Sequence, residues 1–258
     1  MNNTHGSSGA GDKVLAILSY HKIGKPAVPD WDTWFHIPEA IFANQLSYLR
    51  ENSWQVIGLE DFLRSLTAPD SLPERSVLLT FDDGYRSMRR VALPLLVELG
   101  YPAVVFVPTD FIGGHNWFDI DNEPEDIMCD WDDLRELERC GVSVQSHGVS
   151  HRTFSELDLA QQKEELLRSK AVLEEGLGKS ITVFAYPYGD AGVDADMQQN
   201  LLRECGYIAA CLYGGGPVRL PISDPYRLSR VAMGPDTDLE VELERGTDER
   251  EYRNDGRE

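Results

Sequence analysis

The sequence lacks a long hydrophobic run. None of the apolar stretches in its 258 residues reaches the roughly 20 residues that a membrane-spanning helix requires. The first such stretch, residues 14–20, is preceded by neither a basic segment nor a small-residue cleavage site, which distinguishes it from a secretory signal peptide. We interpret it as a buried strand. We therefore expect the chain as given to be cytoplasmic, or extracytoplasmic if a leader has been removed.

Basic residues and cysteines are also scarce. The 24 lysines and arginines are outnumbered by 44 aspartates and glutamates, and the formal net charge of −20 argues against nucleic acid, anionic membranes and polyanionic substrates as partners. Solubility or salt adaptation explains such a charge, and attraction of a cationic product is a narrower alternative. The four cysteines contain no C-x-x-C pair, which favours free thiols over a disulfide framework.

Short apolar segments alternate with helical patterns along the centre of the chain. Most are continuous runs of valine, isoleucine, leucine and phenylalanine, which is typical of parallel strands buried on both faces. The strand candidates are residues 14–20, 77–81, 103–107, 142–145, 182–186, 207–212 and 227–233. Repeated strand–helix units with about seven strands predict an α/β fold, a distorted and incomplete (β/α) barrel whose reactive side chains lie at the carboxyl ends of the strands.

One domain accounts for the patterned part of the chain. We assign residues 13–235 to it and residues 1–12 to a disordered N-terminal tail. Residues 236–258 are assigned to an acidic C-terminal tail that begins with a short helix and then frays. Within the domain, the helical stripe over residues 91–99 contains Pro94, which predicts a kink.

Two adjacent aspartates follow the predicted strand at residues 77–81. Asp82 and Asp83 stand in the segment TFDDG, so both carboxylates fall at the carboxyl end of a buried strand. Like charges there repel unless a cation or a proton separates them. Neighbouring side chains on extended backbone point in different directions, so one carboxylate can bind a metal while the other stays free. The structural alternative is an acidic turn closed by Gly84.

A histidine pair follows the predicted strand at residues 142–145. His147 and His151 are four residues apart, a spacing that places both on one side of a helical turn and lets them chelate one ion. One carboxylate and two imidazoles leave a position for water, as in an open catalytic site. Such a metal would polarise a carbonyl and lower the pKa of water, with the second aspartate as general base. Zinc is the default ion, and cobalt, nickel or manganese are alternatives.

These motifs resemble the first two motifs of the polysaccharide deacetylase family, carbohydrate esterase family 4. The resemblance covers about residues 14–233. In that family the first aspartate is the base and the second binds the metal. This implies Asp82 as the base and Asp83, His147 and His151 as the metal ligands. The family fold, a distorted (β/α) barrel of about seven strands, has the strand number that the sequence pattern predicts.

Further segments resemble later family motifs. In FAYPYG the resemblance implies that the backbone N–H of Tyr188 contributes to an oxyanion hole and that Pro187 lies among the substrate-binding residues. In DWDDL, Trp131 is a candidate wall of a sugar groove, and the alternative is a helix N-terminus with acidic residues near the dipole. Trp117 in NWF is a candidate for stacking on a sugar face, with ordinary packing as the alternative.

The chain departs from the family pattern at two places. Many relatives carry an arginine that braces the base two residues before the motif proline, where this chain has Ala185. Arg230 is our candidate substitute, and a surface ion pair is the alternative. The late general-acid histidine of the family is also absent, since no histidine follows His151. The segment SYHKI resembles the poly-N-acetylglucosamine deacetylase branch, which implies His21 as the acid; the alternative is a structural histidine bonded to a loop carbonyl.

The resemblance therefore implies a metal-dependent hydrolase that removes acetyl groups from N-acetylated sugars by cleaving amide bonds other than peptide bonds. We expect an N-acetylated carbohydrate as its partner. One alternative is a deacylase of a small or lipid-linked amide or of an O-acetyl ester. A catalytically silent carbohydrate-binding protein is the alternative from another class, kept open by the missing arginine and late histidine.

Overall fold

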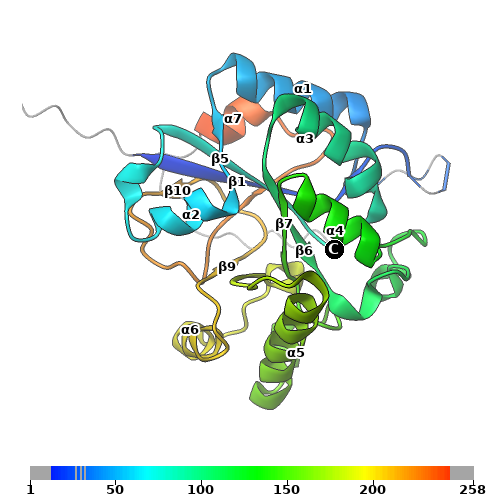
Figure 1. Ribbon diagram of the computed structural model, residues 1–258, viewed down its shortest axis with the longest axis vertical. Helices are drawn as coiled ribbons and strands as arrows, with labels where there is room; N and C mark the ends of the chain where they lie inside the picture. Colours follow the sequence, from blue (N-terminus) through cyan, green and yellow to red (C-terminus); the bar gives the residue numbers. More distant parts are fainter. Residues whose placement is uncertain (1–12, 27, 30, 32, 245–258) are drawn as a thin grey trace, which may run out of the picture.

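A curved, mostly parallel sheet forms the centre of the fold in this computed structural model, which describes residues 13–26, 28–29, 31 and 33–244 (Figure 1). The strands of this sheet are β1 (Val14–Tyr20), β4 (Gln55–Val56), β5 (Arg75–Phe81), β6 (Ala103–Val107), β7 (Val142–Ser146), β8 (Val183–Ala185), β9 (Ala209–Cys211), β10 (Val218–Arg219) and β11 (Val231–Ala232). Their order is β10-β1-β5-β6-β7-β8-β9, with β11 also paired to β1 and β4 to β5. Only β10 runs antiparallel to its neighbour among these described pairs.

Helices connect the strands and cover the sheet. They are α1 (Glu39–Glu51), α2 (Leu59–Ser65), α3 (Leu93–Leu99), α4 (Trp131–Arg139), α5 (Leu159–Leu177), α6 (Ala195–Glu204) and α7 (Leu239–Glu244). In Figure 1, α1, α3 and α4 lie next to one another along the sheet, and α7 lies beside α1. No helix in the described part of the chain is long and apolar enough to span a membrane.

Both faces of the sheet are buried, which explains the continuous apolar runs in the sequence. Successive residues of β1 alternate between two clusters: Leu18 packs in a large cluster with apolar residues of α1 and α3 to α7, whereas Ile17 packs in a smaller one. Phe62 of α2 belongs to the smaller cluster and is fully buried there. The sheet is thus a curled half-barrel with most helices outside, and the predicted incomplete (β/α) barrel is confirmed.

The helix details modify two predictions. Pro94 lies in the first turn of α3, directly after a π-helical segment at Met88–Ala92, so the predicted kink is a change of helix type.

Within the predicted C-terminal tail, Leu239 and Leu243 of α7 are buried in the large cluster. The packed part of the chain therefore extends past the predicted boundary at residue 235. Residues 1–12 and 245–258 lie outside the described part.

A small second sheet, β2 (Lys22–Ile23) with β3 (His36–Ile37), is tied to the connection between β6 and α4 by a buried ion pair. Lys22 Nζ lies 3.0 Å from Glu123 Oε2, and the two side chains are only 1% and 6% exposed. Thr33 also hydrogen-bonds to Glu123, and the Lys22 ammonium lies 4.5 Å from the centroid of the Tyr85 ring. These contacts fix the segment after β1 against a loop distant in sequence.

We expect Lys22→Met to lower the free energy of unfolding by about 3–5 kcal/mol, because it leaves the Glu123 carboxylate buried without its cation. The double variant Lys22→Met/Glu123→Leu should regain much of that loss. Urea unfolding of metal-free protein measures both. Arg64→Met is the matched control, since its pair with Asp61 is about half exposed and such pairs contribute at most about 1 kcal/mol. A single-variant loss no larger than that of Arg64→Met would contradict the expectation.

Candidate metal and catalytic site

The predicted site residues gather at the carboxyl ends of the parallel strands. His21 directly follows β1, and Asp82 and Asp83 follow β5. His147 follows β7, and Tyr188 lies three residues beyond β8. The parallel pairings of β1, β5, β6, β7 and β8 bring these strand ends to one rim. Segments far apart in the sequence therefore meet there.

Asp83, His147 and His151 form a compact buried cluster with the chemistry of a metal site. One potential ligand atom from each residue lies within 4.8 Å of the other two. The Nε2 atoms of His147 and His151 lie 3.4 Å and 3.0 Å from Asp83 Oδ1. Ligands of a tetrahedral zinc at about 2.0–2.1 Å are separated by about 3.4 Å, so the spacing suits one small cation.

The hydrogen bonds of the cluster also fit a cation. Asp83 Oδ1 is buried and forms no hydrogen bond of acceptable geometry, although two imidazole nitrogens surround it. His147 Nδ1 lies 2.7 Å from the carbonyl oxygen of Ala185, and donation to that carbonyl leaves Nε2 free to bind a metal. Burial would raise the pKa of Asp83, but the neighbouring His151 and His147 hold this pKa well below its usual value.

The segment that joins the two histidines is irregular and does not form the predicted helical turn. Gly148 and His151 have positive φ angles of 80° and 56°, which interrupt a right-handed helix. Asp83 and Tyr188 also adopt left-handed conformations, with φ of 68° and 57°. Such backbone is uncommon outside glycine and recurs where side chains are held for function.

Asp82 is held by a bidentate ion pair with Arg230. The two terminal guanidinium nitrogens donate to Oδ1 and Oδ2 of Asp82, each over 2.7 Å, and the arginine is fully buried. Arg230 Nε donates to the carbonyl oxygen of Leu212, and Ser19 Oγ lies 3.4 Å from Asp82 Oδ2. Burial opposes ionisation of Asp82, but Arg230 leads the charges that lower its pKa overall. The structure thus places Arg230 in direct contact with Asp82, the candidate base.

His21 lies in the same electrostatic environment. Burial lowers the pKa of His21, whereas Asp83 and Asp82 act in the opposite direction. Its ring contacts two aromatic rings, with centroids 4.9 Å away for Phe35 and 5.4 Å for Tyr213. His21 Nδ1 is buried without a hydrogen bond, which does not match a structural histidine bonded through that nitrogen to a loop carbonyl.

An aromatic wall, formed by Phe118 and Tyr188, adjoins the cluster of Asp83, His147 and His151. The rings of Phe118 and Tyr188 lie 4.1 Å and 4.7 Å from the ring of His151, measured between centroids. The Tyr188 side chain and Trp117 are each 56% exposed, whereas Pro187 is buried. Trp117 therefore presents an apolar surface to solvent one residue away from a side chain that contacts a candidate ligand.

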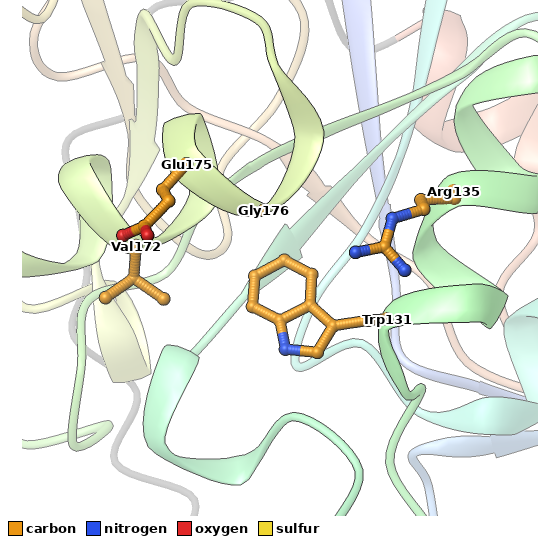
Figure 2. A pocket seen from close by; sticks show the side chains of 5 residues that line it. All are labelled: Trp131, Arg135, Val172, Glu175 and Gly176. Carbon is orange, nitrogen blue, oxygen red and sulfur yellow. The ribbon is translucent and has the colours of Figure 1, made fainter.

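Trp131 lies between two helices and is not part of the cluster of Asp83, His147 and His151. Figure 2 shows its ring in a pocket between α4 and α5 that is lined by Arg135, Val172, Glu175 and Gly176. The ring packs so closely on Gly176 that any Cβ at that position would overlap it. The structure accordingly places Trp131 in helix packing, and this position does not support the predicted sugar contact.

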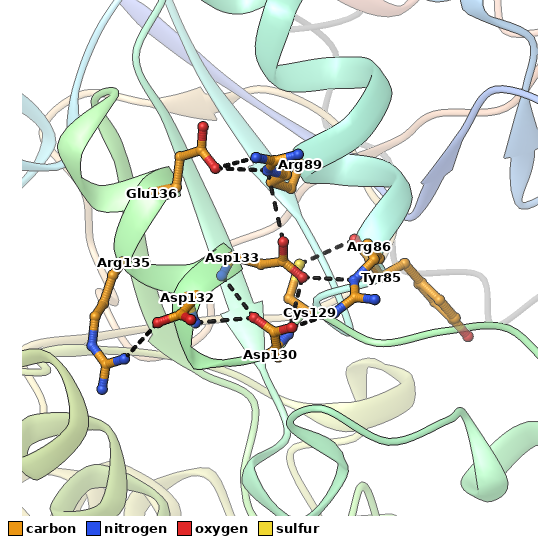
Figure 3. Close-up of polar contacts among 9 residues, drawn as sticks. All are labelled: Tyr85, Arg86, Arg89, Cys129, Asp130, Asp132, Asp133, Arg135 and Glu136. Atoms are coloured by element: carbon orange, nitrogen blue, oxygen red, sulfur yellow. Dashed lines mark hydrogen bonds and ion pairs between the residues drawn. The ribbon is translucent and has the colours of Figure 1, made fainter.

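The acidic residues around Trp131 cap and anchor α4. Asp130 accepts hydrogen bonds from the backbone N–H groups of Asp132 and Asp133, forming a capping box. Figure 3 shows Arg86 between Asp130 and Asp133. Because Arg86 lies three residues after Asp83, these ion pairs fasten the start of α4 to the segment that carries the candidate ligand.

Several neighbours of the site were not among the residues predicted from the sequence. Ser19 was detectable as a polar residue in an otherwise apolar strand, two positions before His21. Phe118 and Tyr213 gave no comparable signal, since aromatic residues in loops are common. Glu165, which bonds to the segment between the two histidines, is one of several acidic residues on α5, so only the tertiary structure reveals its contact.

Comparison with known proteins agrees with this geometry. Residues 70–210 match the family model described as polysaccharide deacetylase. A poly-beta-1,6-N-acetyl-D-glucosamine N-deacetylase of Staphylococcus aureus (strain MRSA252) is 26% identical over 164 residues, which cover 60% of this chain and 54% of that protein. The chain thus spans about half the length of this curated relative.

Two solved structures share the fold. The structure of IcaB from Ammonifex degensii has a TM-score of 0.73 and 27% identity, covering 88% of this chain and 94% of the other. A Streptococcus pyogenes deacetylase, PplD in complex with acetate, has a TM-score of 0.74 and 21% identity over 88% of this chain and 95% of the other. The curled half-barrel is the fold of these deacetylases, and the family model covers more than half of the sequence. The chain belongs to the polysaccharide deacetylase family.

The Asp82–Arg230 pair predicts a pH effect. The pKa of Asp82 is lowered in the folded state, so the pair stabilises the fold above the unfolded-state pKa of about 3.9. This contribution is lost as the pH falls through the folded-state pKa.

In Arg230→Met, Asp82 stays buried beside Asp83 but has lost the neighbouring cation. We therefore expect the pKa of Asp82 to rise, measured by carbon-13 NMR of the aspartate carboxyls in metal-free protein. Arg227→Met, at a partly exposed position, is the control; equal Asp82 titration in both variants would refute the expectation.

Proposed function

We propose that this protein is a metal-dependent N-deacetylase of N-acetylated polysaccharide or oligosaccharide. The observation that carries the proposal is the position of an arginine-bound aspartate, Asp82, beside the buried cluster of Asp83, His147 and His151. Such an arrangement provides an ionised base next to a metal site, as hydrolysis of an unactivated amide requires. The S. aureus relative is named for this reaction on poly-beta-1,6-N-acetyl-D-glucosamine.

Asp83, His147 and His151 would hold the cation through one carboxylate oxygen and two Nε2 atoms. When bound, a divalent cation supplies Lewis-acid polarisation of the amide carbonyl and lowers the pKa of water toward about 7. Zinc suits one oxygen and two imidazole nitrogens, and cobalt, nickel and manganese are accommodated by the same ligand types.

Asp82 accepts the proton of the attacking water in the proposed reaction. The arginine pair occupies one acceptor site on each carboxylate oxygen, and a carboxylate has about four such sites, so capacity remains for the water. Arg230 keeps Asp82 ionised and fixes its orientation. The Tyr188 backbone N–H is proposed to donate to the oxyanion of the tetrahedral intermediate.

His21 is proposed to protonate the departing amine. Its lowered pKa makes protonated His21 a stronger acid than an exposed imidazolium, which favours transfer to an amine. Phe35 and Tyr213 restrict the orientation of its ring. The Trp117 side chain, which is 56% exposed, offers a face on which a sugar ring can stack.

Acetate release tests the reaction. We expect release from poly-β-1,6-linked N-acetylglucosamine oligomers, abolished by a chelator and restored by added Zn²⁺. Monomeric N-acetylglucosamine and an O-acetylated sugar, assayed in parallel, distinguish polymer deacetylation from the small-amide and ester alternatives. If the protein binds the oligomer but releases no acetate with zinc, cobalt, nickel or manganese, an enzymatic function is contradicted.

Asp82→Asn should retain the metal but lose activity by about 10²–10⁴-fold, the usual contribution of a general base. The amide keeps the size of the side chain and removes its basicity. Steady-state acetate release and metal analysis of the same sample give the two readouts. Turnover close to that of the unaltered protein would show that Asp82 is not the base.

His147→Ala should lose the metal itself, because only two of the three proposed ligands remain. Elemental analysis after dialysis measures the stoichiometry. His115→Ala is the matched control, since the His115 side chain is 39% exposed and pairs with Glu125 outside the cluster. Full metal occupancy in His147→Ala would remove this residue from the proposed ligand set.

A further inference from the structure

The backbone between His147 and His151 is held by a single carboxylate on α5. Glu165 Oε2 accepts hydrogen bonds from the N–H groups of Val149 and Ser150, over 2.6 Å and 3.0 Å. Its other oxygen, Oε1, accepts a hydrogen bond from Ser150 Oγ over 2.5 Å. These are the second and third of the three residues that separate the two histidines, so Glu165 binds the centre of the connection.

The same connection is held from its other side by the segment after β6. The carbonyl oxygens of Gly148 and Val149 accept hydrogen bonds from the N–H groups of Thr109 and Asp110, over 3.1 Å and 3.0 Å. Donors and acceptors of the connection thus have partners on two different elements. This accounts for an irregular path that has no helical hydrogen bonds of its own.

Gly148 allows Glu165 to come this close. Its φ of 80° is accessible to glycine, and a Cβ at this position would lie 2.9 Å from Glu165 Oε2. One turn further along α5, Ser169 Oγ lies 2.7 Å from Ser146 Oγ at the end of β7. Two residues of α5 therefore contact the chain immediately before and within the ligand segment.

We propose that Glu165 is a positioning residue that preorganises His147 and His151 to bind a divalent cation. Without it, two backbone N–H groups lose their partner and the segment gains freedom that metal binding must remove again. Groups that orient metal ligands typically change metal affinity by about 10–100-fold when they are altered. The inference rests on the proposed metal site and is independent of the proposed reaction.

Two substitutions separate positioning from charge. Glu165→Gln removes the charge but keeps an oxygen that can accept both backbone N–H groups, while its amide can donate to Ser150 Oγ. Glu165→Asp keeps the charge but shortens the side chain by one methylene group, which moves the carboxylate away from the two backbone N–H groups. If Glu165 acts by position, Co²⁺ affinity should fall by about 10–100-fold in Glu165→Asp and stay within about threefold in Glu165→Gln. Glu164→Gln, on an adjacent and exposed residue, should leave the affinity unchanged.

Competition between the 258-residue chain and a chromophoric chelator for Co²⁺ gives the dissociation constant, and the visible Co²⁺ spectrum reports the ligand geometry. Unfolding of each metal-free variant confirms that affinity is measured on folded protein. Unchanged affinity in Glu165→Asp, including the case in which only its unfolding midpoint drops, would overturn the proposal. So would loss of affinity in Glu165→Gln alone, which would show that the charge acts. If the unaltered protein binds no Co²⁺, Zn²⁺, Ni²⁺ or Mn²⁺, the metal site itself fails and this inference fails with it, whereas metal binding without acetate release counts against the reaction only.

Discussion

Two carboxylates are buried side by side at the end of β5, and much of the rim is arranged to compensate for them. Asp82 and Asp83 are 2% and 5% exposed. Burial and mutual repulsion both disfavour two negative charges there. The structure gives each carboxylate a different partner: a fully buried guanidinium for Asp82, and two imidazoles for Asp83. The backbone turns between them, since Asp83 has a left-handed φ of 68° directly after the extended strand β5.

Side chains from distant elements of the fold hold the candidate base and the candidate ligands in position. Arg230, supplied by the segment just before β11, orients the candidate base, whereas α5 holds the segment with the candidate ligands through Glu165. The ion pairs of Arg86 with the start of α4 support the turn after β5. Asp82 and the segment between His147 and His151 are thus each held by an element other than the strand that precedes them. A rim built in this way can tolerate irregular loops because their orientation does not depend on local backbone preference.

The longer strands could be predicted because hydrophobic runs and parallel pairing depend on local composition. The predicted strands at residues 14–20 and 103–107 coincide with β1 and β6, and the acidic and histidine motifs at strand ends are visible as polar interruptions. Of the five two-residue strands in the described part of the chain, β11 lies within the predicted strand at residues 227–233. The other four, β2, β3, β4 and β10, could not be found, since two residues carry no periodicity.

Tertiary contacts explain the remaining differences. The spacing of His147 and His151 is that of a helical turn, but hydrogen bonds to Glu165 and to the segment after β6 impose an irregular path. Trp131 lies within DWDDL, whose resemblance to a family motif suggested a sugar-groove wall, yet Gly176 leaves room for its ring against α5 (Figure 2). Arg230 could be proposed because the position expected for the family's arginine holds alanine, but its bidentate contact depends on how β11 pairs with β1.

The Lys22–Glu123 pair links two segments of the rim that are far apart in the sequence. Lys22 is adjacent to His21, and Glu123 belongs to the connection that also carries Trp117 and Phe118. A chimaera that received this connection from a relative with a neutral residue at the position of Glu123 would contain a buried ammonium next to His21. Exchange of this connection without Glu123 therefore requires a change at Lys22 as well, so the two segments have to be exchanged together.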